Sequence, residues 1–439
     1  MQVARHLSTY GTSRVATLCG STTVLCMTSN APISVSNPAD ILSYIPHVLG
    51  FQPQESLVFL SMSGKRIGAT LRLDLPMAEA DPLDYAQSVR SYLEADTSAD
   101  GVLMVLYTDR AWREPCSPPY ADLVHCLDLV LETGGLGLLD GWLVSSSHWR
   151  DYFCLDAACC PWPGHPLASI TESVLNAELV YQGSAYEQTL EAAVGTLASV
   201  PSENIQRLTS VYSEQWKGKW DRTSLGRDSL ILWNALITNP DDTQFGRGPE
   251  PIAFLLAGLQ CAAIRDSVIV LSATGLAEAL DATEHSGVLP VAPEEQIVPP
   301  ECALLLSRQA AADQDEADGG SSVPTCPSRP EPAALFREVF LATLAAPNWT
   351  RMDCAHTLFL RLAGITCGEP RSALLSILGW IEWARGRGSR AHRYLQEALA
   401  ETPGYTLGEL LLALVGTGSL SPWARSRETA WTSDSRSAA

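Results

Sequence analysis

The stretch ISVSNPADILSYIPHVLGFQPQESLVFLSMSGKRIGATLRLDLP, from Ile33 to Pro76, decides the fold of the first part of this chain. Asn37, followed directly by proline, is typical of a helix N-cap, and the short helix that it opens is predicted to end at Gly50. Two apolar or alternating runs follow, Ser56 to Met62 and Ile67 to Leu75, with a Ser-Gly-Lys turn between them. This pattern predicts a β-hairpin after the helix.

Strands and helices continue to alternate up to about residue 167. The pattern predicts helices over 83–93 and 120–132 and strands over 101–107, 138–145 and 149–155. The run GVLMVLY is almost wholly apolar, as expected of a strand that is buried on both faces. Residues 33–167 are therefore predicted to form an α/β domain with a mixed sheet.

The second half of the chain is predicted to be all-α. Amphipathic segments at helical spacing replace strands, which indicates helical regions over 168–285 and 333–422. Residues 286–332 are rich in Pro, Ala, Asp, Glu, Gly and Ser, the composition of a flexible linker. The tail 423–439 is predicted to be disordered. Residues 1–32 are interpreted as a disordered leader or as a misannotated start upstream of Met27.

The segment from Ser372 to Pro403 predicts a helical hairpin that resembles a tetratricopeptide repeat. Small and apolar residues occupy that motif's positions at Leu378, Gly379, Ala391, Leu395, Ala398 and Pro403. Leu375 and Glu382 stand where the first helix usually has a large aromatic residue, and no clean second copy follows. Because a peptide-binding groove normally needs at least three repeats, a single hairpin packed on its neighbours is the alternative.

Composition excludes several classes of function. The chain has 439 residues, of which 46% are hydrophobic, and no uninterrupted apolar run has the length of a membrane helix. The net charge of −20 would repel a phosphate backbone, so nucleic acid is not the expected ligand. The twelve cysteines are scattered, and without a convincing export signal we expect reduced thiols and a cytoplasmic location.

One cluster of potential metal ligands lies just past the last predicted strand, in FCLDAACCPWPGHPL. Cys154, Cys159, Cys160 and His165 offer thiolate and imidazole ligands for a tetrahedral zinc ion. Their spacing differs from the CxxC knuckle, and the adjacent Cys159 and Cys160 are awkwardly placed to share one metal. The alternatives are a redox or disulfide role and a packed structural turn stiffened by prolines.

A second group of candidate site residues surrounds the predicted hairpin. Arg72 and Asp74 share one face of a strand, His47 ends the neighbouring helix, and Ser56 begins the other strand, so the four side chains can converge as a catalytic site. The alternative is structural, with an Arg–Asp ion pair near a strand end and a histidine at a helix end. No GxSxG, HExxH or Walker A pattern occurs in the sequence.

The segments PADILSYIPHVLGFQPQESLVFL and LRLDLP resemble the mostly actinobacterial family known as domain of unknown function 4192. The element CLDAACCPWPGHPL and the segment AIRDSV, Ala263 to Val268, resemble that family too. The resemblance runs from about Ile33 to Val415 and is weakest over 286–332. It implies no activity, substrate, cofactor or catalytic residue.

Two hypotheses on function follow from these patterns. The helical half, the acidic charge and the missing catalytic signatures favour a non-catalytic binding or scaffold protein whose partner is another protein held by the helical region. The alternative is an enzyme of unrecognised type, with a site at the strand ends of the α/β domain near Asp74 and the cysteine turn. A zinc ion is the one cofactor that the sequence suggests.

Overall fold

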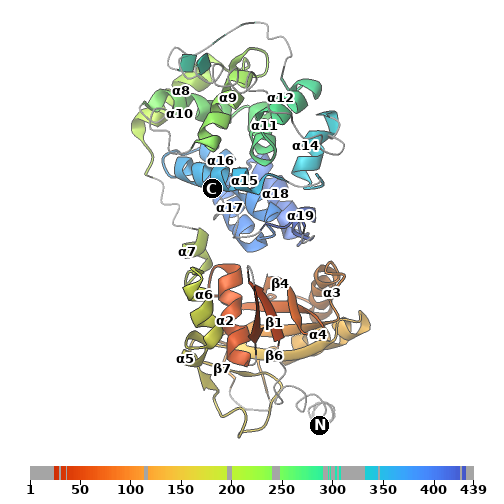
Figure 1. Cartoon of the computed structure of the whole chain (residues 1–439). Coiled ribbons are helices and arrows are strands. Elements are labelled where there is room, and N and C mark those ends of the chain that lie inside the picture. The colour runs from red at the N-terminus through yellow and green to blue at the C-terminus, as the bar shows by residue number, and fades with distance from the viewer. Residues whose placement is uncertain are drawn as a thin grey trace. The chain divides into compact units, whose positions relative to one another are not determined.

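The computed structural model of the chain describes residues 24–28, 31–35, 37–112, 117–194, 200–239, 248–289, 295, 297, 302–303, 306–307, 332–344, 347–425 and 428–431. The chain divides into two compact units, Met1–Gly195 and Thr196–Ala439. Unit 1 is α/β and unit 2 is helical, as the sequence predicted (Figure 1). The division falls at Gly195 and not at residue 167, because the first helices after the sheet pack onto it.

Unit 1 contains a mixed sheet of eight strands in the order β2-β1-β4-β3-β5-β6-β7-β8. Its strands are β1 (Val24–Thr28), β2 (Ala31–Val35), β3 (Ser56–Ser63), β4 (Arg66–Asp74), β5 (Gly101–Tyr107), β6 (Leu138–Val144), β7 (His148–Asp151) and β8 (His165–Pro166). The pairs β1–β4 and β5–β6 are parallel, and the other neighbouring strands are antiparallel. The predicted β3–β4 hairpin and the mixed sheet are therefore confirmed.

Helices cover both faces of this sheet (Figure 1). They are α2 (Pro38–Leu49), α3 (Pro82–Leu93), α4 (Ala121–Thr133), α5 (Ala168–Thr171), α6 (Val174–Tyr181) and α7 (Leu190–Val194). Alternate residues of β3 and β5 point to opposite faces: Phe59 packs with α3 and α4, whereas Val58 packs with α2 and α6. Both faces of the central strands are buried, which explains their continuous apolar sequence.

The N-terminal strands lie within the range that the sequence assigned to a leader or a misannotated start. β1 and the first two residues of β2 belong to residues 1–32, and the two strands pair antiparallel over five residue pairs. Residues 1–23 lie outside the described residues. The same holds for most of the expected linker, 286–332.

Unit 2 is built from helices. They are α8 (Glu203–Gln215), α9 (Leu225–Thr238), α10 (Pro249–Gly258), α11 (Ala262–Ala273), α12 (Leu276–His285), α14 (Pro332–Phe340), α15 (Trp349–Ala363), α16 (Glu369–Ala384), α17 (Gly388–Glu401), α18 (Thr406–Gly416) and α19 (Pro422–Arg425). Every residue of α16 after Glu369 is buried, so this helix forms the centre of the C-terminal part. Within the described ranges, no single helix has the length and apolarity to cross a membrane, and only α10 and α11, bent by 106°, pass that test as a pair.

The predicted helical hairpin is formed by α16 and α17. Its close approach depends on Gly379, because a Cβ atom at this position would lie 2.7 Å from Leu395 Cγ and 3.3 Å from the Ala391 carbonyl oxygen. Ser372 Oγ donates a hydrogen bond across the hairpin to Ala398 O at 2.9 Å and lies within hydrogen-bond distance of Thr402 Oγ1, at 2.8 Å. The likeness to a tetratricopeptide repeat stays a prediction.

We expect Gly379→Ala to lower the free energy of unfolding of unit 2 by about 1–2 kcal/mol. Overpacking a core costs about 1–3 kcal/mol, and the better helix propensity of alanine returns up to about 1 kcal/mol. Urea unfolding followed by circular dichroism measures the change. Gly416→Ala is the matched control, since nothing lies within 4 Å of its added Cβ. An equal stabilisation in both variants would contradict the close packing at Gly379.

Residues 423–425 and 428–431 pack on unit 2, so the predicted disorder of 423–439 is corrected for this part of the tail, and 426–427 and 432–439 lie outside the described residues. Trp423 is buried, and its indole Nε1 donates to Leu344 O at 2.7 Å. Trp349 Nε1 donates to Thr429 O at 2.8 Å, and Trp431 Nε1 donates to Asp353 Oδ1 at 3.0 Å. The tail tryptophan Trp423 thus packs against Trp349 of α15 and Trp380 of α16, and the acceptors for Trp423 and Trp431 come from Leu344 and from Asp353 of α15.

Candidate metal centre

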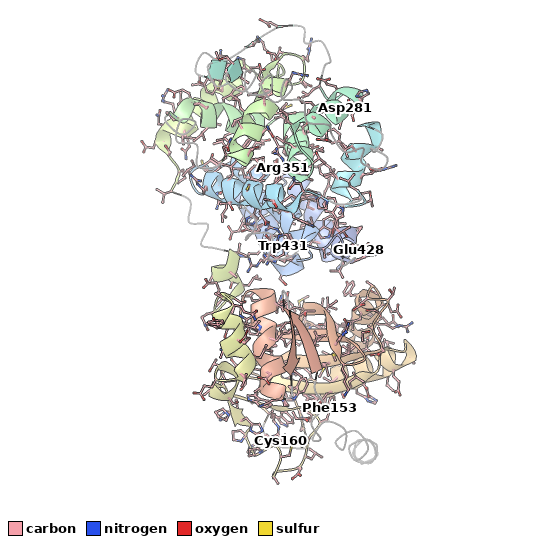
Figure 2. The ribbon with its side chains drawn as sticks, viewed as in Figure 1. Phe153, Cys160, Asp281, Arg351, Glu428 and Trp431 are labelled. Carbon is pink, nitrogen blue, oxygen red and sulfur yellow. The ribbon has the colours of Figure 1, made fainter. Side chains whose placement is uncertain are left out.

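Three of the four sequence-predicted metal ligands meet in the loop between β7 and β8. The Sγ atoms of Cys154, Cys159 and Cys160 all lie within 4.8 Å of one another. Cys154 and Cys160 are buried, and Cys159 is partly exposed. Figure 2 shows Cys160 and Phe153 at the same end of unit 1. The sequence analysis expected adjacent Cys159 and Cys160 to be awkwardly placed to share one metal, and the structure nevertheless brings both sulfur atoms close to that of Cys154.

A tight turn at Asp156 causes this convergence. The backbone N–H groups of Cys159 and Cys160 donate to Asp156 O at 3.2 and 2.8 Å, and the Ala158 N–H donates to Asp156 Oδ1 at 2.8 Å. Asp151 fixes the other end, because its Oδ1 accepts from the Cys154 N–H at 2.9 Å. Such aspartate turns are a local property of the sequence, and here they fold Cys159 and Cys160 back toward Cys154.

His165 is not part of the thiol group. It lies in β8 opposite Trp149, and its ring packs on the Trp149 indole with the centroids 4.7 Å apart. Strand pairing thus directs the imidazole onto an aromatic neighbour. The expected four-ligand set is corrected to three cysteines.

Burial governs the electrostatics of this loop. Burial raises the pKa of the Cys160 thiol well above its usual range, and the neighbouring Cys154 raises it further. Burial also raises the pKa of Asp151, although the hydrogen bonds from the Phe153 and Cys154 N–H groups lower it. The Cys160 thiol is thus protonated without a cation, and a metal ion that binds it must displace its proton.

The sulfur positions fit a thiophilic metal ion. A Zn–S bond of about 2.3 Å places two tetrahedral sulfur ligands about 3.8 Å apart, so a zinc ion would draw the three sulfurs together by about 1 Å at most. Cys159 belongs to an exposed loop segment, where such a shift is easily accommodated. Cysteine sulfur, with no carboxylate among the three ligands, favours Zn²⁺ over Mg²⁺ or Ca²⁺.

Arg150 is a residue of this centre that the sequence analysis did not select. It lies on β7, is buried, and its Nη2 donates to Cys154 O at 3.1 Å. Its guanidinium lies between two indoles, 4.5 Å from the Trp112 centroid and 4.9 Å from the Trp162 centroid. The available signal was an arginine next to a tryptophan in the short strand HWRD.

His47 of the second candidate group ties two helices together. Its Nδ1 lies 2.9 Å from Ser184 Oγ and its Nε2 lies 3.0 Å from Asn176 Oδ1. The Tyr186 ring packs edge-on against it, with centroids 4.8 Å apart. Both ring nitrogens are engaged in docking α2 on α6 and the following loop, which is a structural arrangement.

Arg72, Asp74 and Ser56 lie on the β3–β4 hairpin. Arg72 Nη2 and Asp74 Oδ1 are 2.6 Å apart, and Arg72 also lies over the Phe51 ring at 5.9 Å. Ser56 is paired with Asp74 in the β3–β4 register and is fully buried. The ion pair is the structural alternative that the sequence allowed, and His47 makes its hydrogen bonds with Ser184 and Asn176 instead.

A family model described as Domain of unknown function (DUF4192) matches residues 38–284 and 334–420. The chain belongs to this family. Comparison with curated proteins and with solved structures finds no match. The DUF4192 match includes the cysteine loop and most of both units, and it omits the segment between 284 and 334 that the sequence interprets as a linker.

Proposed function

We propose that this protein binds a divalent zinc ion through the thiolates of Cys154, Cys159 and Cys160. The convergence of the three sulfur atoms within 4.8 Å carries the proposal. Two buried cysteines and one partly exposed cysteine give a site that is closed on the protein side and reachable from solvent on the other.

Three protein ligands leave one tetrahedral position for water or a substrate, which is the pattern of catalytic zinc sites. A zinc ion at this position would polarise a bound carbonyl or lower the pKa of a bound water. This supports the metal-assisted version of the enzyme hypothesis. A protein partner for the helical region and a cytoplasmic location stay predictions, although a reducing compartment would keep the three thiols available.

Zinc titration of the full chain against a chromophoric chelator tests the proposal. We expect one zinc ion per chain. Zinc binding should be about 100-fold weaker or more in Cys154→Ser and Cys160→Ser. The binding free energy of a zinc–cysteine site, about 10–16 kcal/mol, comes from only a few ligands, so the loss of one thiolate removes a large part of it. Cys354→Ser is the matched control, since this partly exposed cysteine lies on α15 in unit 2.

The outcomes separate the alternatives for the loop. Native mass spectrometry after reducing purification should give the mass of one zinc ion above the apoprotein. A mass lacking two hydrogen atoms, restored by reductant, would indicate a disulfide and would contradict the zinc proposal. Unchanged zinc content in both serine variants would contradict it as well.

A further inference from the structure

Arg150 has a buried positive charge whose neighbouring acid, Asp151, feels that charge but makes no hydrogen bond with the guanidinium. No ion pair joins it to a carboxylate within the described part of the chain, and its Nε and Nη1 atoms are buried without a hydrogen-bond acceptor. Only Nη2 is engaged, with Cys154 O. A buried guanidinium with unused donors costs free energy unless an anion lies nearby.

The indole rings of Trp112 and Trp162 compensate part of this cost by cation–π contact. They also fix the plane of the guanidinium, and the two rings meet edge-on with centroids 6.0 Å apart. Arg150 is thus held in one orientation beside the Cys154 backbone. The adjacent Asp151 balances this charge only in part, because it is itself buried and no hydrogen bond joins the two side chains.

The charge of the proposed metal centre supplies that anion. One Zn²⁺ ion with three thiolates has a formal charge of −1, and Cys154 and Cys160 hold two of these thiolates in a buried environment. A buried anion needs a nearby positive charge, and ligands of a metal are commonly stabilised by donors just outside the coordination shell.

We infer that Arg150 is the counter-charge of an anionic zinc–trithiolate centre and positions Cys154 as one of its ligands. The inference rests on the proposed zinc function. The opposing explanation is that Arg150 only pins the loop, through the hydrogen bond to Cys154 O and the two indoles. The two explanations differ in whether the charge itself is required.

Two variants of Arg150 separate charge from shape. Arg150→Gln keeps a planar hydrogen-bond donor and removes the charge, and Arg150→Lys keeps the charge and removes the planar fork. We expect Arg150→Gln to weaken zinc binding by about 10–100-fold, and Arg150→Lys to retain most of the affinity. Arg90→Gln is the control, because Arg90 forms an exposed ion pair with Glu94 on α3.

Co²⁺ in place of zinc provides a second readout. Loss of a nearby positive charge raises the energy of the sulfur electrons, so the sulfur-to-cobalt charge-transfer band should move to longer wavelength in Arg150→Gln and stay in place in Arg150→Lys. If Arg150→Gln does not fold, Arg150→Lys alone distinguishes the two explanations. This variant should keep the charge-transfer band and the zinc affinity if the charge is required, and should lose both if Arg150 only pins the loop.

The results distinguish this inference from the zinc proposal. Wild-type protein that binds neither zinc nor cobalt would overturn both. Wild-type binding with equal losses in the lysine and glutamine variants, or with no loss in either, would overturn the role of Arg150 alone. Weaker zinc binding in Arg150→Gln, with most of the affinity kept in Arg150→Lys and the charge-transfer band shifted only in Arg150→Gln, supports the inference.

Discussion

Replacing Glu382 with alanine is expected to lower the free energy of unfolding of unit 2 by about 3–5 kcal/mol, the usual cost of removing one partner from a buried ion pair. Glu382 is 1% exposed and lies on α16, in which every residue after Glu369 is buried. Its carboxylate lies 3.1 Å from His356 Nε2, forms an ion pair with Arg385, and lies 3.7 Å from Arg387 Nη1. The alanine variant would leave the Arg385 and Arg387 guanidinium groups without this central anion.

The surrounding contacts explain why the cations cannot move into solvent. Arg385 also pairs with Asp353, which accepts a hydrogen bond from Trp431 Nε1. The Trp431 ring lies on Arg387, with 4.2 Å between the guanidinium carbon and the ring centroid. Figure 2 labels Trp431 beside the C-terminal helices. Trp431 of the tail therefore covers the charged groups around Glu382. Burial is the largest influence on the pKa of Arg387 and lowers it to about 10.

Burial alone would raise the pKa of Glu382, but the hydrogen bond with His356 and the charge of Arg385 hold it well below its usual range. A carboxyl group with a lowered native pKa stabilises the fold above its unfolded pKa, and this contribution is lost as the pH falls. We therefore expect the difference between wild type and Glu382→Ala to shrink on acidification below about pH 4.

Urea unfolding at pH 7, followed by circular dichroism, measures this difference. Glu397→Ala is the control, because Glu397 pairs with Arg393 on the exposed side of α17 and such pairs contribute about 0.5 kcal/mol. Equal small losses in the two variants would show that the cluster contributes no more than a surface pair.

The sequence predicted those features that depend on neighbouring residues. The N-cap at Asn37, which accepts from the Ala39 N–H at 2.8 Å, and the β3–β4 hairpin are both formed where expected. The α16–α17 hairpin likewise follows from helical periodicity and from a small residue at Gly379. In each of these three cases, the residues that predict the feature lie close together in the sequence, within about the length of one helix.

Features that depend on distant contacts could not be predicted. The helical sequence of α6 does not say which core it covers, and Leu175 and Leu179 pack on the sheet of unit 1. Arg150 was missed for this reason, since its indole neighbours come from different loops. The turn that brings Cys159 and Cys160 toward Cys154 is different, because its hydrogen bonds to Asp156 and Asp151 are local and the sequence analysis overlooked these two aspartates.

Asp140→Asn is expected to stabilise unit 1 at pH 8 and to leave its stability unchanged at pH 4. Burial, with the charge of Asp151, raises the pKa of Asp140 to about 7, although the Gly141 N–H donates to its Oδ1 at 2.8 Å. The native state therefore holds a proton that the unfolded chain loses near pH 4. Between about pH 4 and pH 7 the unfolded state binds fewer protons, so the stability of the wild type falls as the pH rises.

An asparagine at this position keeps the acceptor for the Gly141 N–H and has no charge to bury. A shift of about 3 pKa units corresponds to at most about 4 kcal/mol, and we expect a gain of about 2–4 kcal/mol above pH 7. Urea unfolding at several pH values, with a chelator present to exclude effects of bound metal, measures it. Asp84→Asn is the control, because Asp84 is exposed in the first turn of α3 and should change stability by less than about 1 kcal/mol. A gain in Asp140→Asn that is the same at pH 4 and pH 8 would mean that packing, and not the proton on Asp140, sets the stability.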